Sequence, residues 1–329
     1  VAQNTTKAAP KTTPKADSKP KTDAPKANTP KAETPKSSVQ QGDDYFNLGL
    51  KYYNEKNLTE AVKYYRKAAE LGHSGAQYNL GVCYDFGEGI AQNKTEAVKW
   101  YRKAADQDHA EAQFNLGVCY YKGEGVEKNL ATARTWWYRS AYRNNATAQY
   151  YYGMCFYEGE GIEEDPLEAR KWFRKAAEQG NVDAQLKLGS GFSAILINRT
   201  EKIKWLTKAA EQGNAEAQYL LADYKHGSEA IKWYQKAADQ GYARAQDRLG
   251  MCYDAGLGVG RSCSEAMIWF LKAAEQGNRN SQYKAGCHYM SGNGGVQSYD
   301  EGTKWLRKAA EQNHRGALCD LGLCYVYGK

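Results

Sequence analysis

Apolar residues recur along most of this 329-residue chain with the period of an amphipathic α-helix. In residues 110–145, the positions Ala112, Leu116, Cys119 and Tyr120 lie on one side of a 3.6-residue helix. A stripe of this width is typical of a helix that buries one face. The pattern therefore predicts a first helix, called helix A, over the first third of this segment.

A second apolar stripe follows after a glycine-containing turn. It consists of Ala133, Trp136, Trp137 and Ala141, which combine large anchors with small contact residues. This stripe predicts a second amphipathic helix, called helix B. Residues 110–145 are therefore expected to form a pair of packed helices.

The same pair recurs through the rest of the chain. Tryptophan marks helix B at intervals of 36, 36, 33, 28, 36 and 36 residues: Trp100, Trp136, Trp172, Trp205, Trp233, Trp269 and Trp305, with Tyr64 in the first unit. Helix A is marked by what we call the repeat glycines: Gly49, Gly81, Gly117, Gly153, Gly189, Gly250, Gly286 and Gly322, with Ala222 in one place. The repeat glycine is expected to let the two backbones approach closely. Together the two series predict an all-α fold of about eight helix pairs plus a terminal helix.

The ends of the expected helices carry their own signals. Helix B is predicted to begin at Thr59, Thr95 or Thr200, each followed by Glu, as is typical of an N-cap. Segments of the form Tyr-x-x-Gly-x-Gly after helix A supply glycines for turns with positive φ. A left-handed residue is expected just after helix B, in a slot that holds Gly72, Gly180, Gly213, Gly241, Gly277, Asp108, Asn144 or Asn313.

The first 42 residues have a different composition from the rest. They contain no aromatic residue, and each of their six prolines is followed by lysine. Eight lysines against three acids give this segment +5 of the net +7 of the chain. Such a sequence has too little apolar surface to fold, so we divide the chain into a disordered tail, residues 1–42, and a helical domain, residues 43–329. The tail is interpreted as a solubilising spacer, or as a segment that contacts an anionic surface or polymer, without specific nucleic-acid binding.

The repeated unit resembles the Sel1-like repeat family, a relative of the tetratricopeptide repeats. Residues 73–108 read HSGAQYNLGVCYDFGEGIAQNKTEAVKWYRKAADQD and match the family pattern almost throughout. The resemblance extends over about residues 43–329 and implies a right-handed α/α superhelical solenoid. The first unit lacks the glycine loop, as do the units around Leu188 and Tyr219, which shorten to 33 and 28 residues. We expect the superhelical curvature to change at these two short units.

Cysteine placement argues against a disulfide framework. Five cysteines share the position two residues after the repeat glycine and are expected to be buried free thiols: Cys83, Cys119, Cys155, Cys252 and Cys324. Any pairing of Cys263, Cys287 or Cys319 is left open. One branch of the Sel1-like family carries paired cysteines in every repeat and is associated with penicillin binding and secretion. This chain lacks that regular pairing.

No arrangement of residues predicts a catalytic, cofactor or metal site. The glycines of residues 256–260 follow a helix and not a strand, so they do not form a dinucleotide fingerprint. The five histidines lie at turns between units or near the end of helix A, without an adjacent acid and nucleophile in a repeated arrangement. We therefore expect a non-enzymatic protein with no cofactor.

The compartment is inferred from the tail. Its Pro-Lys-Ala-Thr composition resembles spacers that cross a bacterial cell envelope, which favours export to the periplasm, envelope or medium; the cytoplasm and the endoplasmic-reticulum lumen are the alternatives. N-x-[ST] sequons at Asn4, Asn57, Asn93, Asn145 and Asn198 have meaning as glycan sites only in a eukaryote. No run approaches the ~18 apolar residues of a membrane-spanning helix. Leu321 and Tyr325 on the terminal helix are expected to be covered by further chain or by another protein.

The functional surface is predicted where the repeats differ. On helix A, the positions three residues before the repeat glycine (−3), one residue after it (+1) and four residues after it (+4) form a stripe roughly opposite the core. By analogy with tetratricopeptide arrays, this stripe would line a concave groove that binds a protein or peptide. The alternative is that the aromatic residues at −3 pack against the next helix A. The candidate partner-binding residues are Tyr78, Asp85, Phe114, Tyr121, Tyr150, Tyr157, Tyr219, His226, Asp254 and Tyr283.

The function that we infer from this stripe is that of a scaffold or adaptor for protein–protein interaction. The alternative, which follows from the resemblance to the cysteine-rich branch, is penicillin or peptidoglycan binding or a β-lactamase-like activity.

Overall fold

The computed structural model describes residues 37–160, 162–191 and 198–327. The predicted tail falls mostly on residues 1–36, which lie outside the described residues, as does Ser193 at one of the +4 positions. The first helix, α1, begins at Ser38 and already buries Gly42. Helical structure therefore starts five residues before the boundary that composition suggested.

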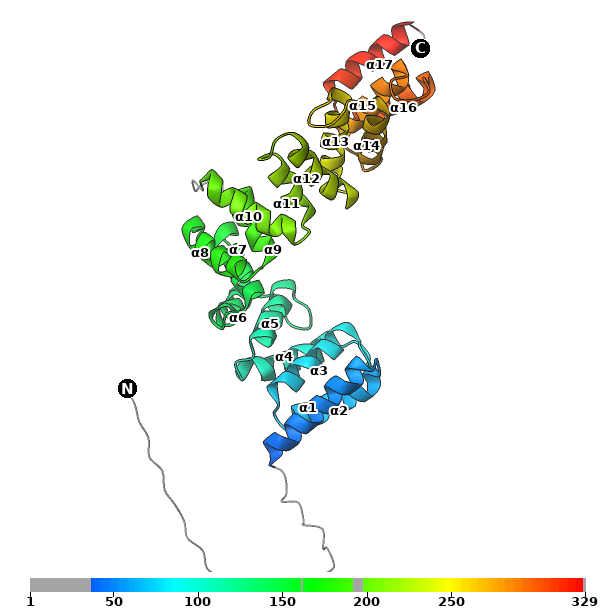
Figure 1. The fold of residues 1–329 in the computed structure, drawn as a ribbon. Helices are drawn as coiled ribbons and strands as arrows, with labels where there is room; N and C mark the ends of the chain where they lie inside the picture. Colours follow the sequence, from blue (N-terminus) through cyan, green and yellow to red (C-terminus); the bar gives the residue numbers. More distant parts are fainter. Residues whose placement is uncertain (1–36, 161, 192–197, 328–329) are drawn as a thin grey trace, which may run out of the picture. The chain divides into compact units, whose positions relative to one another are not determined.

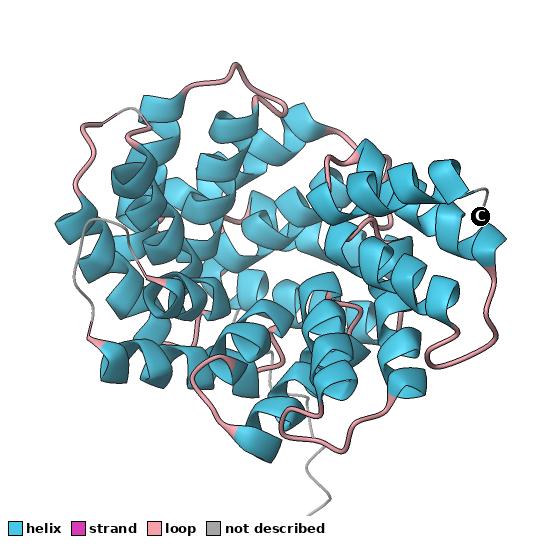
Figure 2. Ribbon diagram, turned by 90° about the horizontal axis from the view of Figure 1, so that it is seen from above, coloured by secondary structure: helices cyan, strands magenta, loops and turns pink. Residues whose placement is uncertain are grey.

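Seventeen helices make up the described part of the chain, which contains no strand (Figures 1 and 2). Odd-numbered helices are A helices and even-numbered ones are B helices. Their bounds are α1 (Ser38–Asn54), α2 (Leu58–Glu70), α3 (Ser74–Phe86), α4 (Lys94–Asp106), α5 (Ala110–Lys122), α6 (Leu130–Tyr142), α7 (Ala146–Glu158), α8 (Pro166–Glu178), α9 (Val182–Ser190), α10 (Arg199–Glu211), α11 (Ala215–Ala222), α12 (Gly227–Asp239), α13 (Ala243–Ala255), α14 (Cys263–Glu275), α15 (Arg279–Ser291), α16 (Tyr299–Glu311) and α17 (Arg315–Tyr327). The prediction of eight pairs plus a terminal helix is confirmed.

Each helix packs against the helix before it and the helix after it, as the order of colours along the array in Figure 1 shows. The core is therefore a continuous row of clusters, each made by two to five consecutive helices. The short helices α9 and α11 also contact each other directly. These are the A helices of the two units that were expected to lose the glycine loop.

The repeat glycine makes room for a side chain of helix B. A Cβ atom added to Gly117 would lie 2.5 Å from Cδ1 of Trp137, and one added to Gly81 would lie 2.6 Å from Cδ1 of Tyr101. The close approach is thus between helix A and the residue after the tryptophan series, rather than between the two backbones alone. That residue is the more deeply buried of the two, since Trp137 is 3% exposed and Trp136 is 9% exposed.

Apart from the fully buried Trp205, the tryptophans of the series lie at the outer edge of the core. A lysine or arginine three residues later covers the ring, as Lys103 does with its Nζ 3.9 Å from the centroid of Trp100. The same cation–π contact recurs at Trp136, Trp172, Trp233, Trp269 and Trp305. The tryptophans therefore mark the period correctly but do not form the centre of each unit.

The predicted threonine N-caps are wrong, because the cap is the asparagine two residues earlier. The side chains of Asn57, Asn93 and Asn198 accept hydrogen bonds from the backbone N–H three residues on. Asparagine is preferred over threonine at the N-cap, and the threonine lies inside the first turn. Three of the sequon asparagines are thus structural caps of B helices, and Asn145 is the cap of α7.

The predicted left-handed slot after helix B is confirmed at all eight positions. The glycines there have φ between +85° and +93°, and Asp108, Asn144 and Asn313 have φ of 67°, 66° and 57°. Asp and Asn are the residues that tolerate this conformation best after glycine. The glycines of the loops after helix A also have positive φ, as in Gly87 (77°) and Gly89 (70°).

A row of buried glutamines joins successive units. Gln77 lies on α3, where its Nε2 donates to the Ala69 carbonyl of the preceding unit, and its Oε1 accepts from Nε2 of Gln107 at the end of helix B of its own unit. We call this row the glutamine ladder. Its glutamine–glutamine bonds lie within units and measure 2.7–2.8 Å. They join Gln107 to Gln77, Gln179 to Gln149, Gln212 to Gln185, Gln240 to Gln218, Gln276 to Gln246 and Gln312 to Gln282.

Candidate binding face on the A helices

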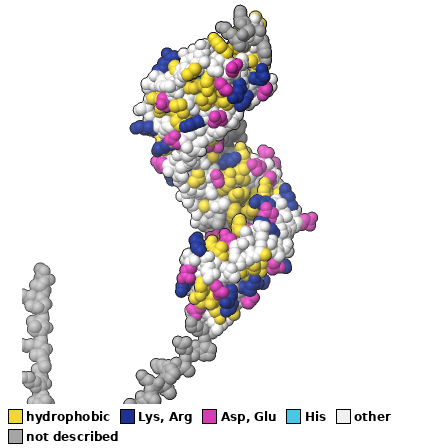
Figure 3. Space-filling view, turned by 90° about the vertical axis from the view of Figure 1, so that its right-hand side faces the viewer, with side chains coloured by type: hydrophobic (Ala, Val, Ile, Leu, Met, Phe, Trp, Pro, Cys, Tyr) yellow, Lys and Arg dark blue, Asp and Glu magenta, His cyan; other side chains and the backbone are white. Residues whose placement is uncertain are grey.

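The −3 and +4 positions lie between consecutive A helices, and we call the surface that they form the A-helix face. Figure 3 shows one side of the molecule, on which hydrophobic side chains reach the surface between groups of charged ones. The chemistry of the A-helix face differs from one junction between units to the next. Each junction is therefore described by its own residues.

Two aromatic residues at −3, Tyr78 and Tyr283, are half-buried and stack on histidines that cap the next A helix. The ring of Tyr78 lies 4.9 Å from that of His109, and the ring of Tyr283 lies 4.4 Å from that of His314. Each histidine also caps the next A helix, since its Nδ1 accepts from a backbone N–H. Burial lowers the pKa of both histidines, which keeps Nδ1 available as an acceptor. Packing against the next unit, the alternative raised for the −3 position, thus describes these residues.

Two of the candidate residues do not present an accessible side chain on helix A. Tyr219 is 8% exposed, with its ring 5.9 Å from Tyr234 and 5.6 Å from Tyr242. His226 is exposed but stands at the N-cap position of α12, because α11 ends at Ala222. The short unit ends helix A before the +4 position is reached, so counting from the repeat position misplaced His226.

The junction between the second and third units is an ion cluster. Asp85 at +4 accepts from Lys94 Nζ at 2.6 Å and from the Tyr101 hydroxyl at 3.1 Å. Lys94 Nζ also lies 3.2 Å from Glu124, which belongs to the glycine loop of the next unit. Both carboxylates raise the pKa of Lys94, so the lysine stays charged. The carboxylates of this junction are therefore paired with a lysine of the chain itself.

The junction between the third and fourth units is an aromatic pocket of about 170 Å³. Tyr121 at +4 and the deeply buried Trp137 have ring centroids 5.4 Å apart, and Trp137 lies 5.2 Å from Tyr151. Tyr150 closes the pocket with its ring edge-on to Tyr151 at 5.5 Å. The Tyr121 hydroxyl donates to Glu160 at 3.4 Å, and the charge of Glu160 raises the pKa of Tyr121. Phe114 packs against the ring of Tyr151 at 5.4 Å.

A second pocket of about 400 Å³ occupies the same register between the first and second units. Tyr53 stands at +4, Tyr65 takes the place of Trp137, and Tyr78 takes the place of Tyr150. The Tyr53 hydroxyl donates to Glu88 at 3.5 Å, as Tyr121 does to Glu160. The two pockets are therefore the same construction in alternate units.

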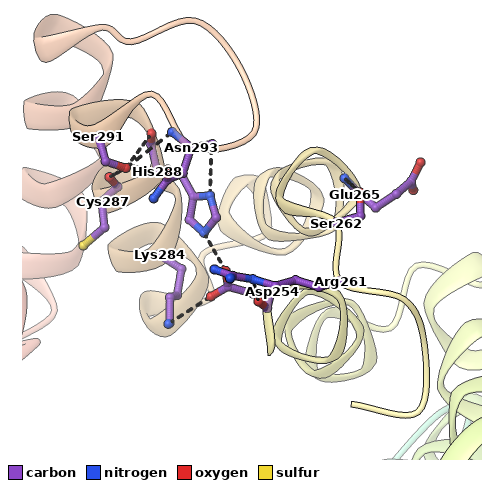
Figure 4. A network of polar contacts seen from close by, with 9 residues as sticks. All are labelled: Asp254, Arg261, Ser262, Glu265, Lys284, Cys287, His288, Ser291 and Asn293. Carbon is purple, nitrogen blue, oxygen red and sulfur yellow. Dashed lines mark hydrogen bonds and ion pairs between the residues drawn. The ribbon is translucent and has the colours of Figure 1, made fainter. Parts of the chain in front are cut away.

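Two further junctions carry internal cations. Tyr157 is 36% exposed, with Lys187 Nζ 4.7 Å from its ring centroid. Asp254 lies 3.4 Å from Lys284 Nζ and 3.5 Å from His288 Nε2 (Figure 4). The buried His288 is held from its other side, because its Nδ1 lies 2.8 Å from the Asn293 carbonyl. This network is a polar link between α13 and α15.

The cysteine ladder forms no disulfide in the described part of the chain. Cys83, Cys119, Cys155, Cys252 and Cys324 are buried free thiols, as predicted, and Cys263, Cys287 and Cys319 are also free. Burial raises the pKa of Cys83 to about 11 and those of Cys119 and Cys155 to about 12. These thiols are protonated at neutral pH and are poor nucleophiles.

The described residues also lack two other kinds of feature. They contain no group of three or more His, Cys, Asp or Glu side chains placed to hold a metal ion. Within the same residues, none of the helices has the length and apolar character needed to cross a membrane.

Sequence reasoning missed the acids and the cation that distinguish the junctions. Glu88, Glu124 and Glu160 all lie seven residues after the repeat glycine, between or beside loop glycines, and Lys94 is the first residue of its helix B. The repeated Gly-Glu-Gly letters were a usable signal for the glutamates. What the letters did not show is that this loop reaches back to the preceding helix B, where a Cβ on Gly125 would lie 2.2 Å from the Lys94 carbonyl oxygen.

Solved structures of known proteins share this architecture. The protein c5321, described as a protective antigen present in uropathogenic Escherichia coli strains, is 31% identical with a TM-score of 0.76, over 88% of this chain and 64% of that protein. A Sel1 repeat protein from Oxalobacter formigenes is 29% identical with a TM-score of 0.65, over 86% of this chain and 87% of that protein. The present chain thus spans slightly less than two thirds of c5321.

Shorter matches are found among curated proteins. A 51-residue stretch is 41% identical to the Helicobacter pylori protein named "Putative beta-lactamase HcpC", and covers 16% of this chain and 18% of that one. A 48-residue stretch is 42% identical to an exopolysaccharide production negative regulator of Rhizobium meliloti, over 15% and 18% of the two chains. The chain spans less than a fifth of the length of these relatives.

The family model of the Sel1 repeat matches eight consecutive segments: residues 44–73, 74–109, 110–145, 146–181, 182–214, 215–242, 243–278 and 279–314. These segments cover most of the chain and coincide with the helix pairs described above. The chain therefore belongs to the Sel1 repeat family.

Proposed function

We propose that this chain is a non-enzymatic scaffold that binds another protein or a peptide along its A-helix face. The observation that carries the proposal is the recurrence of one pocket, built from a tyrosine at +4, a buried aromatic residue of helix B and a loop glutamate, at two junctions. Aromatic side chains in partly exposed pockets are typical anchors of protein interfaces. A row of such pockets suits an extended or helical segment of a partner better than a single small molecule.

The test compares partner capture by the full chain and by variants of the face. Tyr53→Ala and Tyr121→Ala together remove the +4 tyrosine from both pockets, and Tyr142→Ala removes a tyrosine of α6 that is 79% exposed and belongs to neither pocket. We expect the double variant to lose a partner that the wild type and Tyr142→Ala retain, with unchanged helicity by circular dichroism. Equal capture by all three proteins contradicts the proposal.

The basic tail is a separate candidate for partner contact. Replacement of its eight lysines by glutamine removes the charge while the helical array stays intact. If capture depends on the A-helix face, this variant retains the partner. Loss of binding only in the lysine-free variant would instead assign recognition to the tail and to an anionic surface or polymer.

The stretch that resembles HcpC supports a second candidate, a penicillin-binding or β-lactamase-like activity. That resemblance covers about one and a half repeats, and it concerns the repeat pattern itself. The scaffold proposal predicts no hydrolysis of a chromogenic β-lactam above the buffer rate. Hydrolysis that persists in two independent preparations and disappears on denaturation would favour the second candidate.

We also propose that the protein acts outside the cytoplasm, in the cell envelope or the medium. The composition of the tail supports this location, and fractionation of cells that express the gene at its natural level tests it. Recovery of the protein with cytoplasmic markers alone would contradict it.

A further inference from the structure

The ion cluster between the second and third units shows how a lysine of the chain itself can pair with the carboxylates of a junction. There, Lys94 is the first residue of helix α4 and bridges Asp85 at +4 to the loop glutamate Glu124, at 2.6 and 3.2 Å. The lysine head therefore occupies the space between one A helix and the glycine loop of the next unit.

The two aromatic junctions keep the glutamate and lack the lysine. The first residue of helix B is Leu58 in α2 and Leu130 in α6, so neither junction has an internal ammonium group at the position of Lys94. The loop glutamates Glu88 and Glu160 accept only from tyrosine hydroxyls, at 3.5 and 3.4 Å. Within the described ranges, neither glutamate has a lysine, arginine or histidine nitrogen within ion-pair distance.

Aromatic rings line the pocket at the junction that has no lysine at the position of Lys94. At the third junction the rings of Tyr121, Trp137 and Tyr151 stand 5.2–5.4 Å apart around a pocket with Glu158 and Glu160 at its rim. A cation over such rings is attracted by their electron-rich faces, and the attraction grows when the cation loses water. One internal cation, the exposed Lys128, approaches the Tyr121 ring only at 5.8 Å, the outer limit for this contact.

We propose that the pocket between α5 and α7 takes the lysine or arginine side chain of a partner protein, with its charged head between the aromatic rings and the carboxylate of Glu160. This inference rests on the proposed function and names the chemistry that the A-helix face selects. Charge complementarity supports it, because a cation from outside would restore the arrangement that Lys94 provides internally at the neighbouring junction. By register, the pocket of Tyr53 and Glu88 takes a second basic side chain of the same partner.

Methionine methyl groups allow this pocket to be observed without a known partner. The chain has four methionines, and Met154 lines the pocket, so ¹³C-methyl labelling of the full chain gives one reporter and three internal references. The probes are the blocked tripeptides acetyl-Gly-Lys-Gly-amide and acetyl-Gly-Arg-Gly-amide, with acetyl-Gly-Gln-Gly-amide as the uncharged control. We expect saturable shifts of the Met154 signal with the basic peptides, in the millimolar range, and not with the glutamine peptide.

Substitutions at Leu130 test the mechanism of selection. Leu130→Lys introduces an internal lysine at the position that Lys94 holds in the neighbouring unit, whereas Leu130→Gln is a matched control without charge. We expect Leu130→Lys to weaken the binding of the basic peptides about tenfold, equivalent to ~1.4 kcal/mol, and Leu130→Gln to change it less than twofold. Glu160→Gln is expected to weaken binding about fivefold. The basic peptides overturn the inference if they leave Met154 unmoved, if the glutamine peptide shifts it equally, or if Leu130→Lys and Leu130→Gln behave alike.

The outcomes for this inference and for the proposed function are distinguishable. If the tyrosine variants lose partner capture while the Met154 signal does not shift with the basic peptides, the A-helix face binds proteins through other chemistry and only the inference fails. If Met154 responds but the tyrosine variants retain capture, the pocket binds basic side chains and the proposed function fails.

Discussion

The glutamine ladder has one broken step, and repair of that step tests whether the ladder stabilises the array. Gln113 donates its Nε2 to the Ala105 carbonyl at 3.0 Å, but its buried Oε1 has no hydrogen-bond partner. The reason is that the same unit has Arg143 after its helix B, at the place where six other units have glutamine. Arg143 turns instead to Asp108, with which it forms an ion pair. Arg143→Gln is therefore expected to complete the ladder.

The expected gain follows from the burial of each group. A buried acceptor without a partner costs ~1–3 kcal/mol, and a new hydrogen bond from the introduced glutamine amide to Gln113 would remove that cost. The lost ion pair involves side chains that are 41% and 61% exposed, and such pairs contribute only ~0–1 kcal/mol. We expect a net gain of about 1 kcal/mol in the free energy of unfolding, or a rise of about 2 °C in the melting temperature.

Urea and thermal unfolding, followed by circular dichroism, measure this gain against a matched control. Arg143→Met removes the ion pair and adds no amide, so it isolates the contribution of the hydrogen bond. Conversely, Gln179→Met leaves Gln149 Oε1 without its partner and is expected to cost about 1–2 kcal/mol. If Arg143→Gln is no more stable than Arg143→Met, the ladder adds nothing to stability and the reasoning is refuted.

Three further predictions concern the framework. Gly117→Ala should destabilise the array by several kcal/mol in urea titration, because its Cβ would lie 2.5 Å from the facing indole of Trp137. Gly322→Ala is the control, since a Cβ there has no atom within 4 Å, and it should be neutral or stabilising. Equal effects of the two substitutions would contradict the packing role of Gly117. Burial raises the pKa of Cys119 and Cys155 from 9.0 to about 12, so the stability that these thiols contribute is present below pH 9.0 and lost as the pH rises toward 12. The urea midpoint of the double alanine variant should therefore fall less between neutral and alkaline pH than that of the wild type. Burial lowers the pKa of His109 from 6.5, so the stability from its helix cap is present above pH 6.5 and lost as the pH falls below it. The melting temperature of His109→Asn should therefore decrease less on acidification than that of the wild type. An unchanged pH profile would show that the histidine does not contribute.

The amino-acid sequence predicts the framework of this fold well, because the framework depends on periodicity and on residues with special backbone conformations. The number of helix pairs, the shortened units and the left-handed slots at Asp108, Asn144 and Asn313 all follow from such signals. Depth within the core was harder to predict. Trp136 and Trp137 are adjacent and both apolar, and only the contact of Trp137 with Gly117 on the facing helix decides which is deeper.

Polar details depended on where each helix begins and ends and on contacts between helices, which periodicity alone does not encode. Asn57 and Asn93 compete with nearby threonines as caps, and the three-dimensional start of helix B decides between them. The glutamine ladder similarly requires the register of helix A against both its own helix B and the helix B before it. His226 was misplaced for a related reason, because a count of four residues from the repeat position assumes a helix that α11 does not complete.

The candidate binding face differs from the framework, because its chemistry is set by positions at which the repeats vary and not by positions that recur. Three positions distinguish the first three junctions: the +4 residue, the first residue of helix B and the loop residue seven places after the repeat glycine. Where the second of these is Lys94, the junction neutralises its own carboxylates, and where it is Leu58 or Leu130, a glutamate remains beside aromatic rings. Substitution at this one position would thus open or close a junction to basic side chains while the buried glycine and aromatic contacts stay intact. An array of this kind can change its partner without a change in its fold, because the residues that select and the residues that stack lie at separate positions of the repeat.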